Sequence, residues 1–390
     1  MIEPNEVRRA FQNLYGTEPR LFRAPGRVNL IGEHTDYNDG FVMPMAINRD
    51  TVVAARARKD RRVRIHTFNL NETVEFDLDH PGPGGRRHWL DYVEGVAQSL
   101  LRRGTQLRGA DLALKSDVPE GAGLSSSAAL EISVGLALSS VSEVAIDKVQ
   151  LALAGQQAEH EFVGAKVGIM DQYIAALGRA GHALLIDCRS LQPTLIPMNL
   201  PDTAIAICNT RVKHELASSE YNARRAECER GVELLHEVLP DVRALRDVSV
   251  AEFEQYQDLL PEPVKRRCRH IVTENARTLA AADALKAGNL REMGRLMYQS
   301  HESLRDDYEV SCTELDLLVN IARTIEGVAG ARMTGGGFGG CTVNLVHRDN
   351  LQTFQEKISN DYQSKIGHPP FIYVSEAVNG AEEVMGKDEG

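Results

Sequence analysis

Short apolar segments in the first quarter of the chain predict a helix followed by strands. Val7, Phe11 and Leu14 recur at helical spacing near the start. Alternating or β-branched residues joined by short polar stretches then predict strands at 41–47, 51–57, 63–68 and 73–78. A loop of prolines and glycines at 81–85 separates these strands from a predicted helix over 89–101.

The next segment predicts a strand and two helices around a glycine-rich turn. A short strand is expected at 110–115, followed by Asp-Val-Pro-Glu-Gly-Ala-Gly at 117–123, which suits neither a helix nor a strand. Apolar residues then recur at helical spacing over 125–140 and again over 147–162.

The pattern changes near residue 200, where two prolines interrupt the chain. Beyond them we predict a strand at 204–208 and helices at 220–235, 263–286, 289–301 and 313–326. The end returns to strands at 328–334, 342–346 and 371–374, with a glycine turn at 335–340 and a helix at 351–361. We therefore place a boundary near residue 200, between an N-terminal domain, 1–200, and a C-terminal domain, 201–390.

Composition narrows the classes of function. The 390 residues are 43% hydrophobic and 25% charged, which is typical of a globular protein. The net charge of −11 repels a phosphate backbone, so we expect no broad nucleic-acid binding. No apolar run approaches the roughly 20 residues of a membrane helix, and residues 1–20 do not form a signal peptide. The six cysteines form no CxxC pair, so we predict reduced thiols in a cytoplasmic protein.

The turn at 119–128, Pro-Glu-Gly-Ala-Gly-Leu-Ser-Ser-Ser-Ala, has the chemistry of a phosphate-binding loop. Gly121 and Gly123 let the backbone turn sharply and approach a ligand. The serines then open a helix, whose first N–H groups and partial positive charge suit a phosphate. An ordinary glycine turn with a serine cap remains the alternative. The loop is no P-loop, because no lysine follows the glycines, and the GxGxxG match at 335–340 leads into a strand rather than the helix of a dinucleotide fold.

A second motif, Gly-Arg-Val-Asn-Leu-Ile-Gly-Glu-His-Thr-Asp-Tyr at 26–37, continues with Asn-Asp-Gly. With the segments 119–129 and 335–341 it resembles the galactokinase family, in the small-molecule kinase group that also holds homoserine, mevalonate and phosphomevalonate kinases. Further matching segments are 168–172 and 218–221. The resemblance covers about residues 20–345. It implies the α+β, two-domain GHMP-type kinase fold, with an N-terminal and a C-terminal α+β domain and the active site in the cleft between them. It also implies transfer of the γ-phosphoryl group of ATP to the 1-hydroxyl of galactose.

The resemblance also implies roles for single residues. Asp171 would accept or orient the proton of the sugar hydroxyl, and Arg27 would stabilise the transferring phosphoryl group. The implied sugar-binding residues are Glu33, His34, Asp36, Gly168 and Tyr221. The implied ATP loop is Gly121, Ala122, Gly123, Leu124, Ser125, Ser126 and Ser127, and the implied Mg2+ ligands are Ser127 and Glu159.

Plainer interpretations of these residues stay open. Asp171 suits a helix N-cap, Glu159 a solvated helix position and His34 a satisfied structural histidine. Arg27 suits an exposed loop, and the glycine turn 335–340 either supports the fold or contacts substrate.

Two alternative functions also stay open. One is a kinase for another sugar with a 1-hydroxyl, such as N-acetylgalactosamine or arabinose, and the other is a non-catalytic sensor of galactose and ATP. The intact Gly-Leu-Ser-Ser-Ser-Ala run and Asp171 argue against the sensor. We expect a monomer that binds galactose and ATP, with no nucleic acid, membrane or obligate protein partner.

Overall fold

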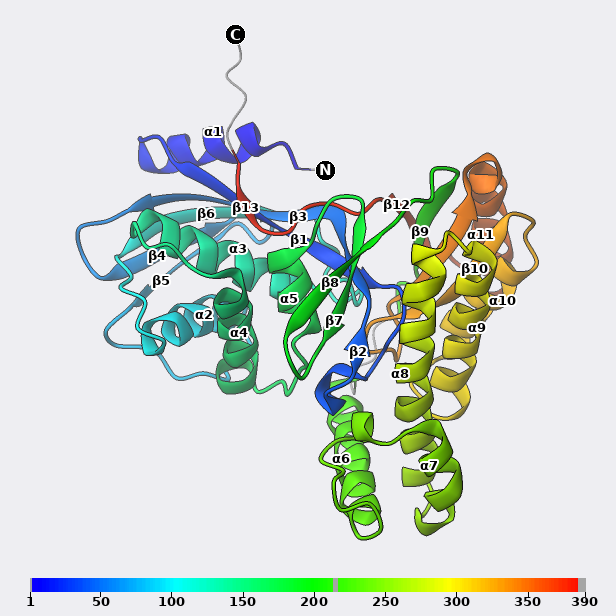
Figure 1. Ribbon diagram of the computed structural model, residues 1–390. Helices are drawn as coiled ribbons and strands as arrows, with labels where there is room; N and C mark the ends of the chain where they lie inside the picture. Colours follow the sequence, from blue (N-terminus) through cyan, green and yellow to red (C-terminus); the bar gives the residue numbers. More distant parts are fainter. Residues whose placement is uncertain (1, 213–216, 385–390) are drawn as a thin grey trace.

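The computed structural model describes residues 2–212 and 217–384, in which helices flank three β-sheets (Figure 1). The largest sheet has six strands in the order β13-β1-β3-β6-β4-β5. Neighbouring strands are antiparallel except β4 and β6, which are parallel. Its strands are β1 Arg20–Asn29, β3 Pro44–Ala57, β4 Arg62–Thr67, β5 Glu72–Asp77, β6 Ala110–Ser116 and β13 Glu382–Glu383.

Helices cover both faces of this sheet. Helix α1 lies on one face and α2 to α5 lie on the other (Figure 1). Successive strand residues point to opposite faces, so Val52 packs toward α1 while its neighbour Val53 packs into the core under the other helices. The helices are α1 Pro4–Tyr15, α2 Leu90–Arg102, α3 Ser126–Val141, α4 Lys148–Ala158 and α5 Met170–Leu177, and a π-helical turn at Glu159–Val163 extends α4.

The second sheet is antiparallel, in the order β10-β11-β9-β12. Ile207 on one face packs in a core with α8 and α9, and its neighbour Cys208 on the other face packs with α10 and α11. The strands are β9 Thr203–Asn209, β10 Val328–Thr334, β11 Cys341–His347 and β12 Phe371–Ser375. The helices are α8 Val264–Lys286, α9 Leu290–Asp306, α10 Thr313–Arg323 and α11 Leu351–Ile366.

The remaining elements are a third, smaller sheet, two further helices and short 3-10 turns. The third sheet contains β2 Phe41–Val42, β7 His182–Asp187 and β8 Gln192–Pro197. Helices α6 Ala217–His236 and α7 Val250–Tyr256 lie at the far end of the second half (Figure 1). Short 3-10 turns occur at Asp36–Asn38, Leu245–Asp247, Gln257–Leu259 and Arg348–Asn350. In the described part of the chain, no helix is long and apolar enough to cross a membrane.

Most of the predicted helices and strands are present, with three corrections. The predicted strands 41–47 and 51–57 are mainly one long strand, β3, preceded by the two-residue β2. The helix predicted over 147–162 is α-helical only to Ala158 and then becomes the π-helical turn. Strands β1, β7, β8 and β13 and helix α7 were not predicted.

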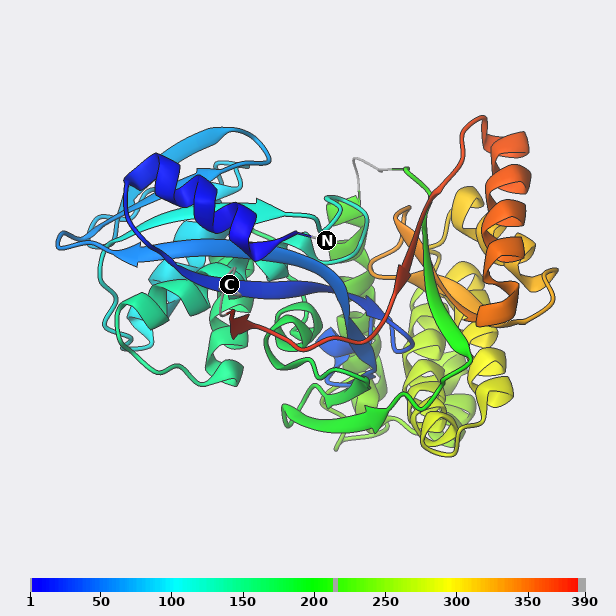
Figure 2. The ribbon, with the colours of Figure 1, turned by 90° about the horizontal axis from the view of Figure 1, so that it is seen from above.

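The division into domains 1–200 and 201–390 stays a prediction. Strand β9 begins the second sheet at Thr203, close to the expected boundary. The end of the chain, however, passes from β12 in the second sheet to β13, which pairs with β1 in the first sheet (Figure 2). One core also joins the halves, since Met43 and Met45 pack in the same cluster as Met297.

Candidate active site

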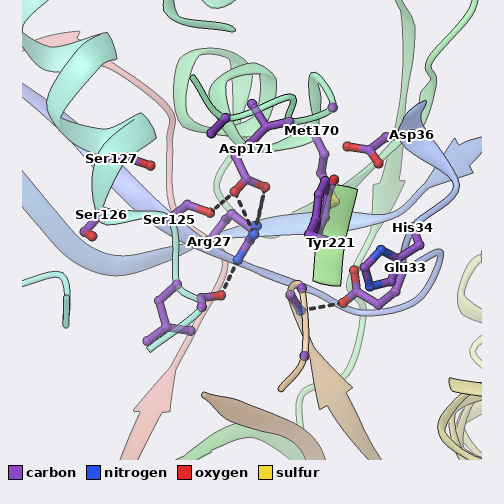
Figure 3. A pocket seen from close by; sticks show the side chains of 18 of the residues that line it. Arg27, Glu33, His34, Asp36, Ser125, Ser126, Ser127, Met170, Asp171 and Tyr221 are labelled. Atoms are coloured by element: carbon purple, nitrogen blue, oxygen red, sulfur yellow. Dashed lines mark hydrogen bonds and ion pairs between the residues drawn. The ribbon is translucent and has the colours of Figure 1, made fainter. Parts of the chain in front are cut away.

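All three sequence motifs line one cavity of about 410 Å³ (Figure 3). The first motif contributes the end of β1 and the loop after it, the second contributes the start of α3, and the third contributes the glycine turn between β10 and β11. The loop before α5 and Tyr221 of α6 complete the wall. The lining residues predicted from the sequence are Arg27, Glu33, His34, Asp36, Gly121, Gly123, Leu124, Ser125, Ser126, Ser127, Gly168, Asp171 and Tyr221.

Two predicted residues do not line this cavity. Ala122 is buried in the core between the two halves, so its side chain anchors the loop rather than facing a ligand. Glu159 lies behind Ser127 and reaches the cavity through that hydroxyl. In the matching segment 218–221, Tyr221 is described, whereas the side chains of Ser218 and Ser219 lie outside what the structure describes.

Arg27 and Asp171 form a two-pronged ion pair at the centre of the cavity (Figure 3). Nε and Nη2 of Arg27 donate to the two carboxylate oxygens of Asp171, each at 2.8 Å, and Nη1 donates to the carbonyl of Gly123. Ser125 donates a third hydrogen bond to Asp171, at 2.5 Å. Arg27 is 4% exposed, which excludes an exposed loop arginine. Asp171 is not an N-cap either, because α5 begins at Met170 with Ile169 as its cap residue.

The second motif forms a tight loop that leads into helix α3. Gly121, Gly123 and Ser125 all have positive φ, at 65°, 70° and 62°. These conformations turn the backbone so that Ser126 and Ser127 begin the helix facing the cavity (Figure 3). The N–H groups of the first turn of α3 therefore face a position where an anion is favourable.

The third motif supports this loop and also lines the cavity. A Cβ on Gly335 would lie 2.9 Å from the carbonyl of Gly123, and a Cβ on Gly340 would lie 2.9 Å from the carbonyl of Ala122. Only glycine allows the two motifs to approach this closely. The turn therefore supports the fold, and its residues Gly335, Gly336 and Gly337 also line the cavity, so contact with a substrate stays a prediction.

Ser127 and Glu159 form a pair of oxygen donors at one side of the cavity. The Ser127 hydroxyl donates to Oε1 of Glu159 at 2.9 Å, and Gln172 donates to the same oxygen at 3.1 Å. The π-helical turn places Glu159 in the interior, where it is 6% exposed, so it is not a solvated helix residue. Burial raises the pKa of Glu159 to about 7, and a nearby cation would favour its ionised form.

Glu33 is held by donors from two motifs. Its Oε1 accepts from the backbone N–H of Gly335 at 2.8 Å and from Nη1 of Arg332 at 3.2 Å. Its Oε2 accepts from the side chain of Asn29 at 2.9 Å. Burial raises the pKa of Glu33, and the charge of Arg332 acts in the opposite direction.

Asp36 lies against Gly168 on the same wall of the cavity. A Cβ on Gly168 would lie 1.7 Å from Oδ2 of Asp36, so this contact requires glycine. The backbone N–H of Tyr37 donates to Oδ1 of Asp36 at 3.0 Å. Burial raises the pKa of Asp36 to about 7, and the nearby charge of Asp171 adds to this shift.

His34 has a left-handed backbone, with φ of 63°, and its ring faces the cavity. Its Nδ1 is 2.8 Å from the hydroxyl of Tyr37, which is 2.7 Å from the hydroxyl of Tyr308. Nε2 of His34 is buried, and the ring also interacts with the backbone of Gly336. Burial lowers the pKa of His34 to about 3, so the ring is neutral at pH 7. The ring of His34 therefore combines structural hydrogen bonds with a position in the cavity wall.

Sequence reasoning missed Arg332 and Gln172 as residues that hold the site. The signal for Arg332 was a charged residue inside an otherwise apolar strand, Val328–Thr334. Gln172 follows Asp171 directly, but its contact with Glu159 depends on how α4 and α5 pack. Lys166 also lines the cavity and brings a positive charge to it.

Three family models match the chain in order. They are described as the galactokinase galactose-binding signature, at residues 9–57, the GHMP kinases N terminal domain, at 91–179, and the GHMP kinases C terminal, at 281–364. The chain is 50% identical over 390 residues to a galactokinase of Chloroflexus aggregans, covering 100% of both chains. It is 48% identical over 386 residues to a galactokinase of Roseiflexus, covering 99% of this chain and 98% of that protein.

Solved structures of kinases also match the chain. The crystal structure of Lactococcus lactis galactokinase complexed with galactose matches with a TM-score of 0.94 at 38% identity, covering 97% of this chain and 99% of that one. Mevalonate kinase of Methanococcus jannaschii matches with a TM-score of 0.64 at 19% identity, covering 94% of this chain and 100% of that one. The second likeness concerns the fold alone, which is the two-domain GHMP-type kinase fold.

Proposed function

The chain belongs to the galactokinase family, and we propose how its residues carry out that family's reaction. It is an ATP-dependent sugar kinase that phosphorylates galactose at the 1-hydroxyl to give galactose 1-phosphate, the first committed step of galactose catabolism. The observation that carries the mechanism is the Arg27–Asp171 pair, which lies between the carboxylates of the first motif and the start of α3.

Asp171 is the proposed proton acceptor. Its carboxylate would take the proton of the sugar 1-hydroxyl while that oxygen bonds to the γ-phosphorus and the bond to the leaving ADP oxygen breaks. Arg27 fixes the orientation of this carboxylate through two parallel hydrogen bonds and places a positive charge where negative charge develops. Ser125 donates to the same carboxylate and would help to hold it in place.

The first motif and Tyr221 form the proposed galactose site. Sugar hydroxyls both donate and accept, so buried carboxylates such as Glu33 and Asp36 suit them as acceptors. The ring of His34 lines the same cavity and is the third proposed sugar contact of this motif. A site in which each polar group expects a hydroxyl rejects an epimer, because the wrong sugar leaves a buried group unpaired.

The loop 121–127 and the first turn of α3 form the proposed phosphate site. Ser127 and Glu159 are hard oxygen donors within hydrogen-bond distance of each other, which is the ligand type that Mg2+ prefers. We propose that they hold Mg2+ together with phosphate oxygens and water. When bound, the ion would neutralise charge on the phosphates.

A second cavity of about 490 Å³ is the proposed adenine site. It shares Tyr92, Ser126 and Ser127 with the first cavity, so a nucleotide can extend from one into the other. Trp89 and Leu130 give it an apolar and aromatic lining, which suits a flat base.

We further propose that the protein is active as a monomer and that it is located in the cytoplasm. All six cysteines are free thiols and five of them are buried, which supports a reducing compartment. Light scattering during turnover would detect an oligomer if one is required.

ADP release from Mg2+-ATP with a panel of sugars tests the activity. We expect turnover with galactose and little with glucose or mannose, because the site is built to match each hydroxyl. If kcat/KM for N-acetylgalactosamine or arabinose is at least tenfold higher than for galactose, that sugar is the preferred substrate. No turnover on any sugar, with galactose still binding in calorimetry, would indicate a sensor.

A further inference from the structure

Arg332 is a fully buried arginine to which the mechanism above assigns no role. It lies in β10, close to the glycine turn that begins at Gly335. Its Nη1 donates to the carbonyl of Asn29 and to Oε1 of Glu33, both at 3.2 Å. Its Nε and Nη2 have no hydrogen-bond partner among the described residues. Burying a guanidinium with unpaired N–H groups is costly, so stability alone does not account for it.

A second carboxylate, Glu274 of α8, faces Arg332 from the other side. Its Oε1 is 4.0 Å from Nη2 of Arg332 and accepts hydrogen bonds from the Ser300 hydroxyl and the backbone N–H of Gly32, at 2.6 and 2.9 Å. Its Oε2 accepts from Arg277 at 2.8 Å. The same carboxylate therefore faces the guanidinium and holds the backbone directly before the first sugar-binding residue.

The hydrogen bonds at Glu33 show what Arg332 does. A carboxylate oxygen has about two acceptor sites. Arg332 and the Gly335 N–H occupy both sites of Oε1, whereas Asn29 occupies one site of Oε2. One acceptor position remains, on Oε2, in a side chain that lines the cavity. The arginine thus determines which oxygen of Glu33 can receive a sugar hydroxyl.

We propose that Arg332 is a positioning residue for galactose: it holds Glu33 in the orientation and charge state that accept a sugar hydroxyl, and Glu274 holds Arg332. The inference rests on the proposed role of Glu33 in binding the sugar. Neither Arg332 on β10 nor Glu274 on α8 lines the cavity. The proposal therefore makes galactose binding depend on two residues that do not contact the sugar.

The charge state of Glu33 gives this proposal a measurable signature. Burial raises the pKa of Glu33, and Arg332 is the strongest influence that lowers it. The other charged or titratable groups around Glu33 are Arg27 on β1, His34 and Asp36 on its own loop, and His270 and Glu274 on α8. If Arg332 is removed, Glu33 keeps its proton to a higher pH, and a protonated carboxyl accepts a sugar hydroxyl poorly.

Arg332→Met and Arg332→Lys test the proposal in the full-length protein. At pH 7 we expect Arg332→Met to raise the KM for galactose at least tenfold and to change the KM for ATP by less than about twofold. The increase in the galactose KM should become smaller as the pH rises, because Glu33 then loses its proton. Arg332→Lys keeps the charge but not the geometry, so we expect a smaller rise in KM and a nearly normal pH profile. If Arg332→Met does not fold, the galactose KM of Arg332→Lys decides, since an unchanged value would contradict the proposal.

Arg267→Met is the matched control. Arg267 is also a buried arginine between two glutamates, Glu227 and Glu309, but it lines no described cavity and contacts no sugar-site residue. We expect it to lower the melting temperature and to leave the galactose KM and its pH profile unchanged. Equal changes in Arg267→Met and Arg332→Met would mean that Arg332 is merely structural.

Glu33→Gln separates this inference from the proposed function. A normal galactose KM in Glu33→Gln would remove Glu33 from the sugar site, and the role of Arg332 with it. A raised KM in Glu33→Gln together with a normal KM in both Arg332 variants would refute the positioning role alone. We expect the double variant Arg332→Met, Glu33→Gln to be little worse than Glu33→Gln, because both changes remove the same interaction.

Discussion

Gly168 provides the most direct test of the sugar site, because the structure leaves no room for a side chain there. A Cβ at this position would lie 1.7 Å from Oδ2 and 2.0 Å from Cγ of Asp36. Non-bonded carbon and oxygen atoms stay about 3.3 Å apart, so Gly168→Ala must displace either the Asp36 carboxylate or its own loop by about 1.5 Å. Gly168 does not have a positive φ, so steric contact is the main effect of the change.

The size of the effect follows from the hydrogen bond that would be lost. A hydrogen bond to a charged group contributes about 1.5–3 kcal/mol, which corresponds to a factor of roughly 10 to 150. We therefore expect Gly168→Ala to lower kcat/KM for galactose by that factor. The KM for ATP should change by less than about twofold, because the phosphate loop lies on another wall of the cavity.

Initial-rate kinetics with each substrate varied in turn, together with the melting temperature, measure this directly. The matched control is a double-mutant cycle with Asp36→Ala, which removes the carboxylate that a Cβ would meet. Adding Gly168→Ala to Asp36→Ala should then cost little. Two independent, multiplying losses, or a folded Gly168→Ala enzyme with normal kcat/KM, would refute the steric argument.

Four further outcomes are expected. Asp171→Asn should lower kcat by about 10²- to 10⁴-fold while ATP still binds in calorimetry, and near-normal turnover would remove Asp171 from proton transfer. Glu159→Gln should shift the Mg2+ titration of activity to higher concentration, and an unchanged titration would place the metal elsewhere. Trp89→Ala should raise the KM for ATP and leave that for galactose unchanged, or the second cavity does not hold adenine. Finally, kcat/KM for galactose should fall as the pH drops below about 7, and Asp36→Asn should flatten this limb.

The sequence predicted the elements whose local pattern is regular. Long helices such as α3 and α8 have apolar residues at helical spacing, and their boundaries differ from prediction by at most one residue. Strand β1 was not predicted, because it contains Pro25 and Gly26, which normally argue against a strand. The structure accommodates them with a shift of register between Pro25 and Arg27. Strand β8 likewise contains two prolines, and β13 has only two residues.

The parts of the site that lie within one motif could be predicted, and the parts that depend on packing could not. The resemblance identified Arg27 and Asp171, and the structure places them 2.8 Å apart. The contact between Glu33 and Arg332 joins positions 299 residues apart, and no local pattern indicates such a pair. The burial of Glu159 depends on a π-helical turn, which a helical repeat of apolar residues does not reveal.

The four carboxylates of the site differ in the partners that stabilise their ionised forms. This difference explains why Asp36 should determine the pH below which kcat/KM for galactose falls. Asp171 is paired with Arg27, and Glu33 with Arg332. Glu159 accepts from Ser127 and Gln172 on the nucleotide side. Asp36 has no ion pair with a cationic side chain among the described residues, and the charge of Asp171 raises its pKa further.

Asp36 therefore becomes protonated near pH 7, and below that pH it can no longer accept a sugar hydroxyl as a carboxylate does. Measuring this acidic fall in kcat/KM at saturating Mg2+-ATP separates Asp36 from Glu159. The pKa of Glu159 is also about 7, but its proposed role is on the nucleotide side. If kcat/KM for galactose still falls below about pH 7 in Asp36→Asn, the titrating group is another residue of the proposed sugar site.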